Sequence, residues 1–220
     1  MVREPVDVIL PCLDEAGALP GVLARLPPGY RAIVVDNGST DGSPEIAAEH
    51  GARVVTEHRR GYGAAVHTGL ETATADVVCF MDADGSLDAG TLPTLVAALD
   101  GGGVQLAVGR RVPAARGVWP WHARGANALL SALLRARGLD VHDIAPVRAA
   151  RRTELLALGV ADRAFGYPLE LLIKASRAGW RVREFAVPYG PRADGTTSKV
   201  SGSVRGTLRA ARDMARVWRA

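Results

Sequence analysis

The first 110 residues alternate short apolar runs with segments of helical period, and this alternation is the strongest constraint on the fold. It is typical of β-α units, which build a mainly parallel sheet covered by helices. The apolar runs predict strands at residues 6–10, 32–35, 53–56, 77–81 and 105–108. The segments between them predict helices at residues 18–25, 44–50, 63–72 and 92–99. We therefore expect an α/β fold, with one domain over residues 1–220 because no repeat or low-complexity segment divides the chain.

Two further features narrow the class of protein. The only cysteines, Cys12 and Cys79, cannot form a disulfide framework, and no zinc-binding spacing occurs. No signal peptide precedes the first strand, and no run of roughly 18 apolar residues occurs later. We expect a cytoplasmic protein without a membrane span, either free or peripheral at the inner face of the cell membrane.

Charge is distributed unevenly along the chain. Residues 1–100 contain 6 basic and 15 acidic residues, whereas residues 101–220 contain 21 basic and 8 acidic residues. A basic half of this kind fits nucleic acid, a phosphorylated substrate or an acidic membrane surface. Aromatic residues make up only 5% of the chain, and no RNA-binding signature is present. We therefore expect no nucleic-acid partner.

Polar clusters follow three of the predicted strands. In open α/β sheets, ligands bind at the carboxyl ends of the strands, so these clusters should meet at one edge. The cluster at residues 37–42 also fits an ordinary turn before a helix. The clustered side chains that we single out are Pro11, Asp14, Glu15, Asp36, Asn37, Asp82 and Asp84.

Asp82 and Asp84 form the most specific of these clusters. Two carboxylates this close repel each other unless a cation lies between them, and Mg²⁺ or Mn²⁺ would take both together with a diphosphate and water. The alternative is a helix-capping aspartate in a polar loop. Residues 61–63 begin like a dinucleotide fingerprint, but Val66 replaces the third glycine, and no phosphate-binding P-loop occurs.

Together these motifs resemble the inverting glycosyltransferases of family 2 with the GT-A fold, in the dolichyl-phosphate mannose synthase-like branch. Residues 8–15, 34–42, 61–65 and 82–84 carry the resemblance. It implies that residues 1–110 bind a nucleotide sugar and that a basic half, residues 111–220, binds the acceptor. It also implies that Asp82 and Asp84 hold the metal and diphosphate, with Asp84 catalytic. Pro11, Glu15 and Asp36 would line the nucleoside pocket, and Asp14, Asn37 and Gly63 would also belong to the substrate-binding residues.

The chain departs from the family pattern at three positions. Asp14 replaces an asparagine and Asn37 replaces an aspartate, which leaves the base of the nucleotide open. Ser86 stands where many relatives of this branch have a glutamine near the metal, and a water would take the place of that ligand.

The basic half contains arginine-bearing loops that suit phosphate oxygens. The resemblance places Arg111, Arg192, Ser198 and Lys199 around the donor diphosphate or a phosphate acceptor, with Arg148 in a related motif. Any single surface arginine is more often merely solvated.

A hydroxyl acceptor would also need a general base, whereas a phosphate acceptor would not. Glu170, in the first turn of a predicted helix, and Asp143 are the candidates. The helix dipole alone also favours a carboxylate at position 170.

The last twenty residues predict a helix with a basic stripe and an adjoining, mostly apolar stripe. The stripes are Arg205, Arg209, Arg212, Arg216 and Arg219, and Val204, Leu208, Ala211, Ala215 and Trp218. A solvated surface helix explains this pattern, as does contact with an anionic membrane joined by Trp119 and Trp121.

These expectations combine into one function. The sequence predicts a metal-dependent, inverting hexosyltransferase that uses UDP-glucose or GDP-mannose and a polyprenyl or dolichyl phosphate acceptor. The alternatives are transfer to a soluble hydroxyl acceptor and a non-catalytic nucleotide-sugar-binding protein.

Overall fold

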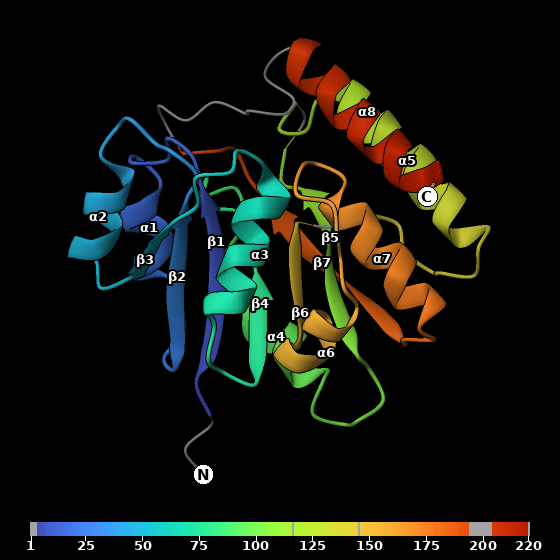
Figure 1. Cartoon of the computed structure of the whole chain (residues 1–220), viewed down its shortest axis with the longest axis horizontal. Helices are drawn as coiled ribbons and strands as arrows, with labels where there is room; N and C mark the ends of the chain where they lie inside the picture. The colour runs from blue at the N-terminus through green and yellow to red at the C-terminus, as the bar shows by residue number, and fades with distance from the viewer. Residues whose placement is uncertain (1–3, 116, 145, 194–203, 220) are drawn as a thin grey trace.

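The computed structural model describes residues 4–115, 117–144, 146–193 and 204–219, with side chains of the last segment described from residue 209 to 218. Its centre is a seven-stranded sheet with the order β3-β2-β1-β4-β6-β5-β7 (Figure 1). The strands are β1 (Val6–Cys12), β2 (Tyr30–Asp36), β3 (Arg53–Thr56), β4 (Val77–Phe80), β5 (Leu106–Pro113), β6 (Val147–Arg151) and β7 (Val182–Tyr189).

Strands β1 to β4 are parallel, as predicted. β6 lies between β4 and β5 and runs antiparallel to both, and β7 pairs parallel with β5. All five strands predicted from the sequence are present. The sequence did not predict β6 and β7, and the sheet is therefore mixed at the end that the C-terminal half builds.

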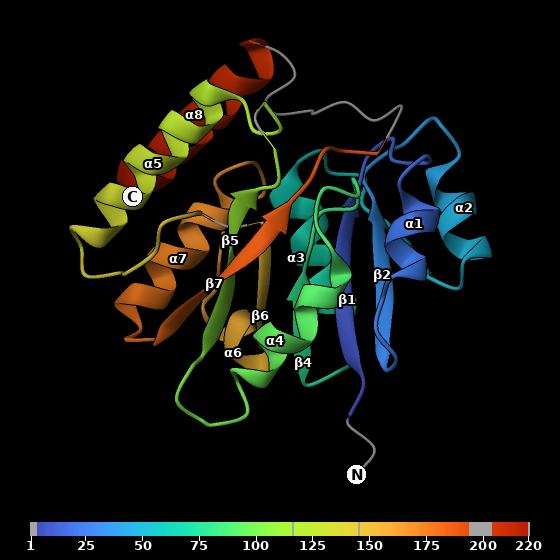
Figure 2. The same ribbon diagram turned by 180° about the vertical axis from the view of Figure 1, so that it is seen from behind.

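Helices cover both faces of the sheet. They are α1 (Leu19–Ala24), α2 (Ser43–Glu49), α3 (Tyr62–Thr72), α4 (Leu92–Ala97), α5 (Trp121–Arg135), α6 (Arg152–Ala157), α7 (Tyr167–Arg177) and α8 (Val204–Arg219), with a 3₁₀ turn η1 (Ala89–Thr91). Figures 1 and 2 show α3, α6 and α7 in front of one face and α4 in front of the other. Within the described residues, no helix is both long enough and apolar enough to cross a membrane.

Alternate side chains of the strands supply two cores, one under each helical layer. In β1, Val8 and Leu10 pack with α1 and α4, whereas Ile9 points to the opposite face and packs under α3. This alternation follows from the period of two along a strand. Cys12 and Cys79 are free buried thiols, as expected, and burial raises the pKa of Cys12 to about 11. Helices thus bury both faces of the sheet, so a ligand would bind at an edge of the sheet.

A short antiparallel contact joins the loop after β4 to the segment after β7. Leu87 and Tyr189 form an isolated bridge, and the amide of Gly190 donates to the carbonyl of Ser86 at 2.9 Å. The amide of Ala193 donates to the carbonyl of Asp84 at 3.0 Å. This contact brings the C-terminal half over the carboxyl ends of β1 and β4.

Candidate active site

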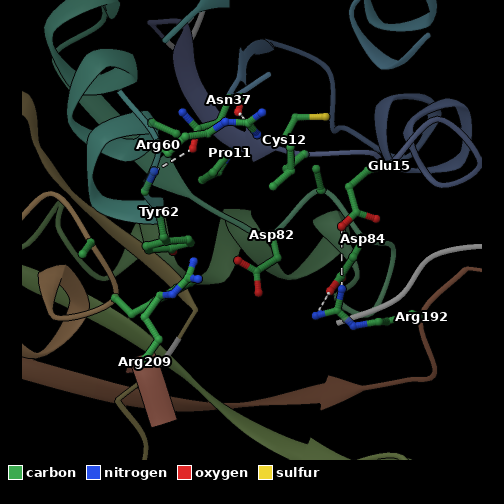
Figure 3. A pocket seen from close by; sticks show the side chains of 16 residues that line it. Pro11, Cys12, Glu15, Asn37, Arg60, Tyr62, Asp82, Asp84, Arg192 and Arg209 are labelled. Carbon is green, nitrogen blue, oxygen red and sulfur yellow. Dashed lines mark hydrogen bonds and ion pairs between the residues drawn. The ribbon is translucent and has the colours of Figure 1, made fainter. Parts of the chain in front are cut away.

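A pocket of about 510 Å³ lies at the carboxyl edge of the sheet, where the sequence predicted a site. Six residues predicted to bind substrate or metal line it: Pro11, Glu15, Asn37, Asp82, Asp84 and Arg192. Figure 3 shows their side chains converging from the end of β1 and from the loops after β1, β2, β4 and β7. The remaining lining comes from Cys12, Leu13, Arg60, Gly61, Tyr62, Ala65, Ala83, Ala164, Phe165 and Arg209.

Asp84 is buried at one side of this pocket, and both of its oxygens are engaged. Oδ1 accepts hydrogen bonds from the amide of Ser86 at 2.9 Å and from its hydroxyl at 2.6 Å. Oδ2 lies 2.8 Å from Nη2 of Arg192, whose Nη1 is 3.7 Å from Oε1 of Glu15. Arg192 therefore bridges two carboxylates, as Figure 3 shows. Ser86 occupies the position where many relatives of the suggested branch have a glutamine near the metal. In this structure its amide and hydroxyl orient Asp84.

Asp82 has a different environment. Its carboxylate points into the pocket and accepts no hydrogen bond from the residues that the structure describes (Figure 3). Burial, and then repulsion by Asp84, raises the pKa of Asp82 to about 7. A bound cation would relieve both effects, so the carboxylate fits a metal site.

No group of three or more His, Cys, Asp or Glu side chains within the described part of the chain could hold a metal ion. Mg²⁺ and Mn²⁺ are commonly held by one or two carboxylates, with water and substrate phosphates as the other ligands. Asp82 and Asp84 therefore fit such an ion only together with a phosphate-bearing substrate. Arg192 would then exchange its contact with Asp84 for one with phosphate.

Asp14, Asp36 and Asn37 shape the loops at this edge. Asp36 accepts from the amides of Gly38 and Ser39, and Asp14, at a φ of 53°, accepts from the amide of Thr40 at 2.8 Å. Neither Asp14 nor Asp36 lines the pocket.

The side-chain amide of Asn37 donates to the carbonyls of Glu57 and Arg59, and its oxygen accepts from the amide of Gly61 at 2.8 Å. This amide provides both donor and acceptor groups, which an aspartate could not do. Asn37 thereby fixes the chain segment that leads into α3.

Gly63 lies at the start of α3 and packs against the loop at residues 162–164. Its amide donates to the carbonyl of Ala164 at 3.0 Å, and the amide of Ala64 donates to that of Arg163 at 2.9 Å. The first amides of α3 are thus satisfied by the chain itself, and Gly63 does not line the pocket. Its role is a close approach between two segments.

Substitution of Gly63 by alanine is expected to lower the melting temperature. A Cβ there would lie 2.8 Å from Cβ of Tyr167 and 2.9 Å from two backbone atoms of the 162–164 loop. Overpacking of this kind lowers the free energy of unfolding by about 1–3 kcal/mol. Gly21→Ala in α1 is the matched control, because a Cβ there meets only a side-chain atom of Arg25 at 3.6 Å. The control should melt at or above the wild-type temperature, since alanine favours a helix. Equal melting of Gly63→Ala and wild type would contradict the close approach.

A smaller pocket of about 130 Å³ adjoins the larger one and shares Tyr62, Asp82 and Phe165 with it. Arg111 supplies a positive charge to this pocket. The rest of its wall is apolar and consists of Ile144, Pro146, Pro168 and Met214. The arrangement is a cationic site surrounded by apolar side chains, next to Asp82.

Arg111 is held rigidly. Its Nε and Nη2 donate to the two oxygens of buried Asp143 at 2.8 and 2.7 Å, and its guanidinium lies 4.0 Å from the ring centroid of Trp119. Burial opposes the charged form, but the hydrogen bonds to Asp143 outweigh it and raise the pKa of Arg111. Arg148 lies buried in β6 nearby, where desolvation lowers its pKa to about 10. Asp143 thus acts as the partner of Arg111 in this structure.

The structure does not bring Glu170 into either pocket. Its oxygens accept from the amides of Ala161 and Asp162, and Lys174 lies 3.3 Å from Oε1. Burial alone would raise the pKa of Glu170, but these partners lower it. Glu170 therefore stabilises the loop before α7. Ser198 and Lys199 lie outside the described residues.

The residues of the larger pocket that were not predicted as site residues include four with large or charged side chains: Arg60, Tyr62, Phe165 and Arg209. Tyr62 stands between the two glycines of the 61–63 motif, and Arg209 belongs to the basic stripe of α8, so both had a sequence signal. Figure 3 shows Arg209 pointing from α8 toward the pocket.

The described part of α8 packs differently from the expected stripes. Ala210 and Asp213 are buried, whereas Ala211 and Ala215 of the expected apolar stripe are exposed. The amide of Phe165 lies 3.5 Å from Oδ2 of Asp213, so the buried face of α8 covers the loop before α7.

Comparison with known proteins gives this geometry a context. The chain is 57% identical over 218 residues to an uncharacterized glycosyltransferase of Mycobacterium tuberculosis, with 99% of each chain covered. It is 34% identical over 219 residues to a polyprenol monophosphomannose synthase of Mycolicibacterium smegmatis, covering 89% of this chain and 81% of that one.

Among solved structures, it is similar to glucosyl-3-phosphoglycerate synthase of M. tuberculosis in complex with Mn²⁺, UDP-glucose and phosphoglyceric acid. The TM-score is 0.75 at 25% identity, covering 98% of this chain and 80% of that one. Residues 7–158 match the family model described as glycosyl transferase family 2. The chain has the GT-A fold, is a glycosyltransferase and belongs to glycosyl transferase family 2.

Proposed function

We propose that this chain is a metal-dependent, inverting transferase that moves a hexose from a nucleotide sugar, UDP-glucose or GDP-mannose, to polyprenyl phosphate. The observation that carries the proposal is the smaller pocket beside Asp82. It combines Arg111, a cation held in place by Asp143, with the apolar walls of Ile144, Pro146 and Met214. A phosphate joined to a hydrocarbon chain has the same combination of charge and apolar surface.

The larger pocket would bind the donor. Pro11 and Asn37 line it beside β1 and β2, where a nucleoside would fit. Arg192 lies by Asp84 and Glu15, so we place the diphosphate at these side chains and Asp82. A divalent cation on Asp82 and Asp84 would supply positive charge for the departing nucleoside diphosphate. In this assignment Asp14, Asp36 and Gly63 support the pocket and do not contact the donor.

A phosphate acceptor also suits the acids and bases present. The described lining of the smaller pocket contains one carboxylate, Asp82, which we assign to the metal. A phosphate oxygen already carries negative charge, so it can attack the sugar without a general base. Arg111 would orient that oxygen, and Glu170 and Asp143 would take no proton in this reaction.

We assign the donor to residues 1–110 and the acceptor to residues 111–220, with one qualification. Phe165, Arg192 and Arg209 of the C-terminal half also line the larger pocket. The two halves therefore function as one catalytic domain.

A soluble phosphorylated acceptor is the second candidate. The relative with phosphoglyceric acid bound supports it, and Arg111 would serve such an acceptor as well. The polyprenol monophosphomannose synthase relative and the apolar wall favour the lipid acceptor.

The test offers each labelled donor, with Mn²⁺, to polyprenyl phosphate or to 3-phosphoglycerate. We expect label to enter the organic phase with one donor only, and EDTA to abolish this transfer. Label in an aqueous, anionic product would support the soluble acceptor instead. Absence of free nucleoside diphosphate in every arm would contradict catalysis and support a binding protein.

A further inference from the structure

Helix α5 has an apolar face with exposed large side chains. Side chains of Trp121, Leu129 and Leu133 are 84%, 62% and 38% exposed, which is unusual for residues of this size. They recur at helical spacing with small residues between them. We call this set, Trp121, Gly125, Ala128, Leu129, Ala132 and Leu133, the α5 outer face.

The charged residues of α5 itself have one sign. Residues 101–139 contain no aspartate or glutamate, and the exposed arginines Arg124 and Arg135 lie along one side of the α5 outer face. α8, which runs along the same end of the molecule in Figures 1 and 2, adds exposed Arg212 and Arg216. Arg137 stacks on Trp218 at 3.8 Å and so links the end of α5 to α8.

We propose that the α5 outer face is a docking surface for an anionic lipid bilayer. An apolar helical face bordered by arginines is the pattern of helices that lie in the membrane interface, and a tryptophan is favoured there because its ring is amphipathic. A second copy of the chain fits less well, because a symmetric contact would bring Arg124 and Arg135 of both copies together. The occupant that complements both the apolar side chains and the positive charge is an anionic membrane.

The contacts of α5 connect the proposed docking surface to the smaller pocket. The side-chain amide of Asn127 donates to the carbonyl of His142, and its oxygen accepts from the amide of Ile144 at 3.0 Å. Ile144 lines the smaller pocket, and Trp119, two residues before α5, stacks on Arg111. A bilayer bound to α5 would therefore lie beside the pocket proposed for polyprenyl phosphate. The sequence alone pointed to α8, joined by Trp119 and Trp121, for this contact. Trp121 is part of the α5 outer face, whereas Trp119 stacks on Arg111 and the buried face of α8 covers the loop before α7.

Sedimentation of the purified protein with lipid vesicles tests this inference. The assay contains no donor or acceptor, so a negative result would contradict membrane docking without bearing on the proposed transferase activity. We expect binding to vesicles that contain phosphatidylglycerol, weaker binding at high salt, and little binding to phosphatidylcholine alone. The double variant Trp121→Ser, Leu129→Gln should bind about tenfold more weakly or worse. Val112→Gln, which changes another exposed apolar residue, should bind like wild type.

Separate variants test the electrostatic contribution to vesicle binding. Arg124→Gln and Arg135→Gln should each weaken binding about fivefold, the equivalent of about 1 kcal/mol. Arg25→Gln, which changes an exposed arginine directly after α1, is the control. Circular dichroism verifies that each variant is folded.

Two outcomes would overturn the inference. One is wild-type protein that stays in solution with anionic vesicles at low salt. The other is a wild-type dimer by light scattering that the Trp121→Ser, Leu129→Gln variant dissociates, with no change in vesicle binding; this would assign the α5 outer face to a second copy.

Discussion

Replacement of Asp82 by asparagine is expected to abolish transfer while leaving the protein as stable as wild type or more so. The carboxylate accepts no hydrogen bond from the described residues and lies near Asp84. Asparagine has the same shape without the charge, so it removes this repulsion and cannot bind the metal. Loss of several kcal/mol of transition-state stabilisation lowers kcat roughly a thousandfold. Label transfer at saturating donor and Mn²⁺ measures kcat, and a thermal melt measures stability.

Asp88→Asn is the matched control for this change. Asp88 is exposed and accepts from the amide of Gly90 at 3.0 Å, a capping contact that asparagine preserves. It should therefore transfer sugar at the wild-type rate. Asp84 is less informative, because its substitution would also release Ser86 and Arg192. Wild-type kcat in Asp82→Asn would contradict the metal assignment, and a lower melting temperature would contradict the account of its charge.

Replacement of Arg111 by methionine is expected to destabilise the fold by about 3–5 kcal/mol, because it breaks a buried ion pair and removes two side-chain hydrogen bonds to Asp143. The double variant Arg111→Met, Asp143→Asn should recover most of this loss. An asparagine oxygen can still accept from the amide of residue 111, which lies 2.9 Å from Asp143. Urea denaturation of the three proteins measures the difference.

Activity separates the two roles of Arg111. Both variants lack the cation of the smaller pocket, so the KM for polyprenyl phosphate should rise in both, while the KM for the donor stays near wild type. Recovery of stability without recovery of acceptor binding is the expected pattern. A wild-type acceptor KM in the double variant would show that Arg111 serves only the ion pair with Asp143.

The sequence predicted the strands of the first half because they are short, mostly apolar runs, most of them buried in the sheet. β6 and β7 were not predicted because charged residues interrupt their apolar residues: arginine in Val147–Arg151, and arginine and glutamate in Val182–Tyr189. Their place in the sheet depends on pairing with distant strands, which local patterns do not encode.

The candidate site could also be predicted only in part from the sequence. Strand position correctly predicted that Asp82, Asp84 and Glu15 reach one edge, but position does not reveal which way a side chain points. Asp14 and Asp36 follow strands in the same way and instead bind loop amides. Arg60 and Arg209 enter the larger pocket from segments far apart in the chain, so only the three-dimensional arrangement identifies them.

The position of β6 between β4 and β5 also bears on the order of events during synthesis. While a ribosome has released the chain only as far as β5, strands β1 to β4 can pair, but β5 has no neighbour until Val147–Arg151 emerges. The carboxylates of Asp82 and Asp84, which follow β4, would then be arranged early, on a sheet of local β-α units. Arg111, the arginine in the described lining of the smaller pocket, would reach its place later, after long-range pairing closes the sheet.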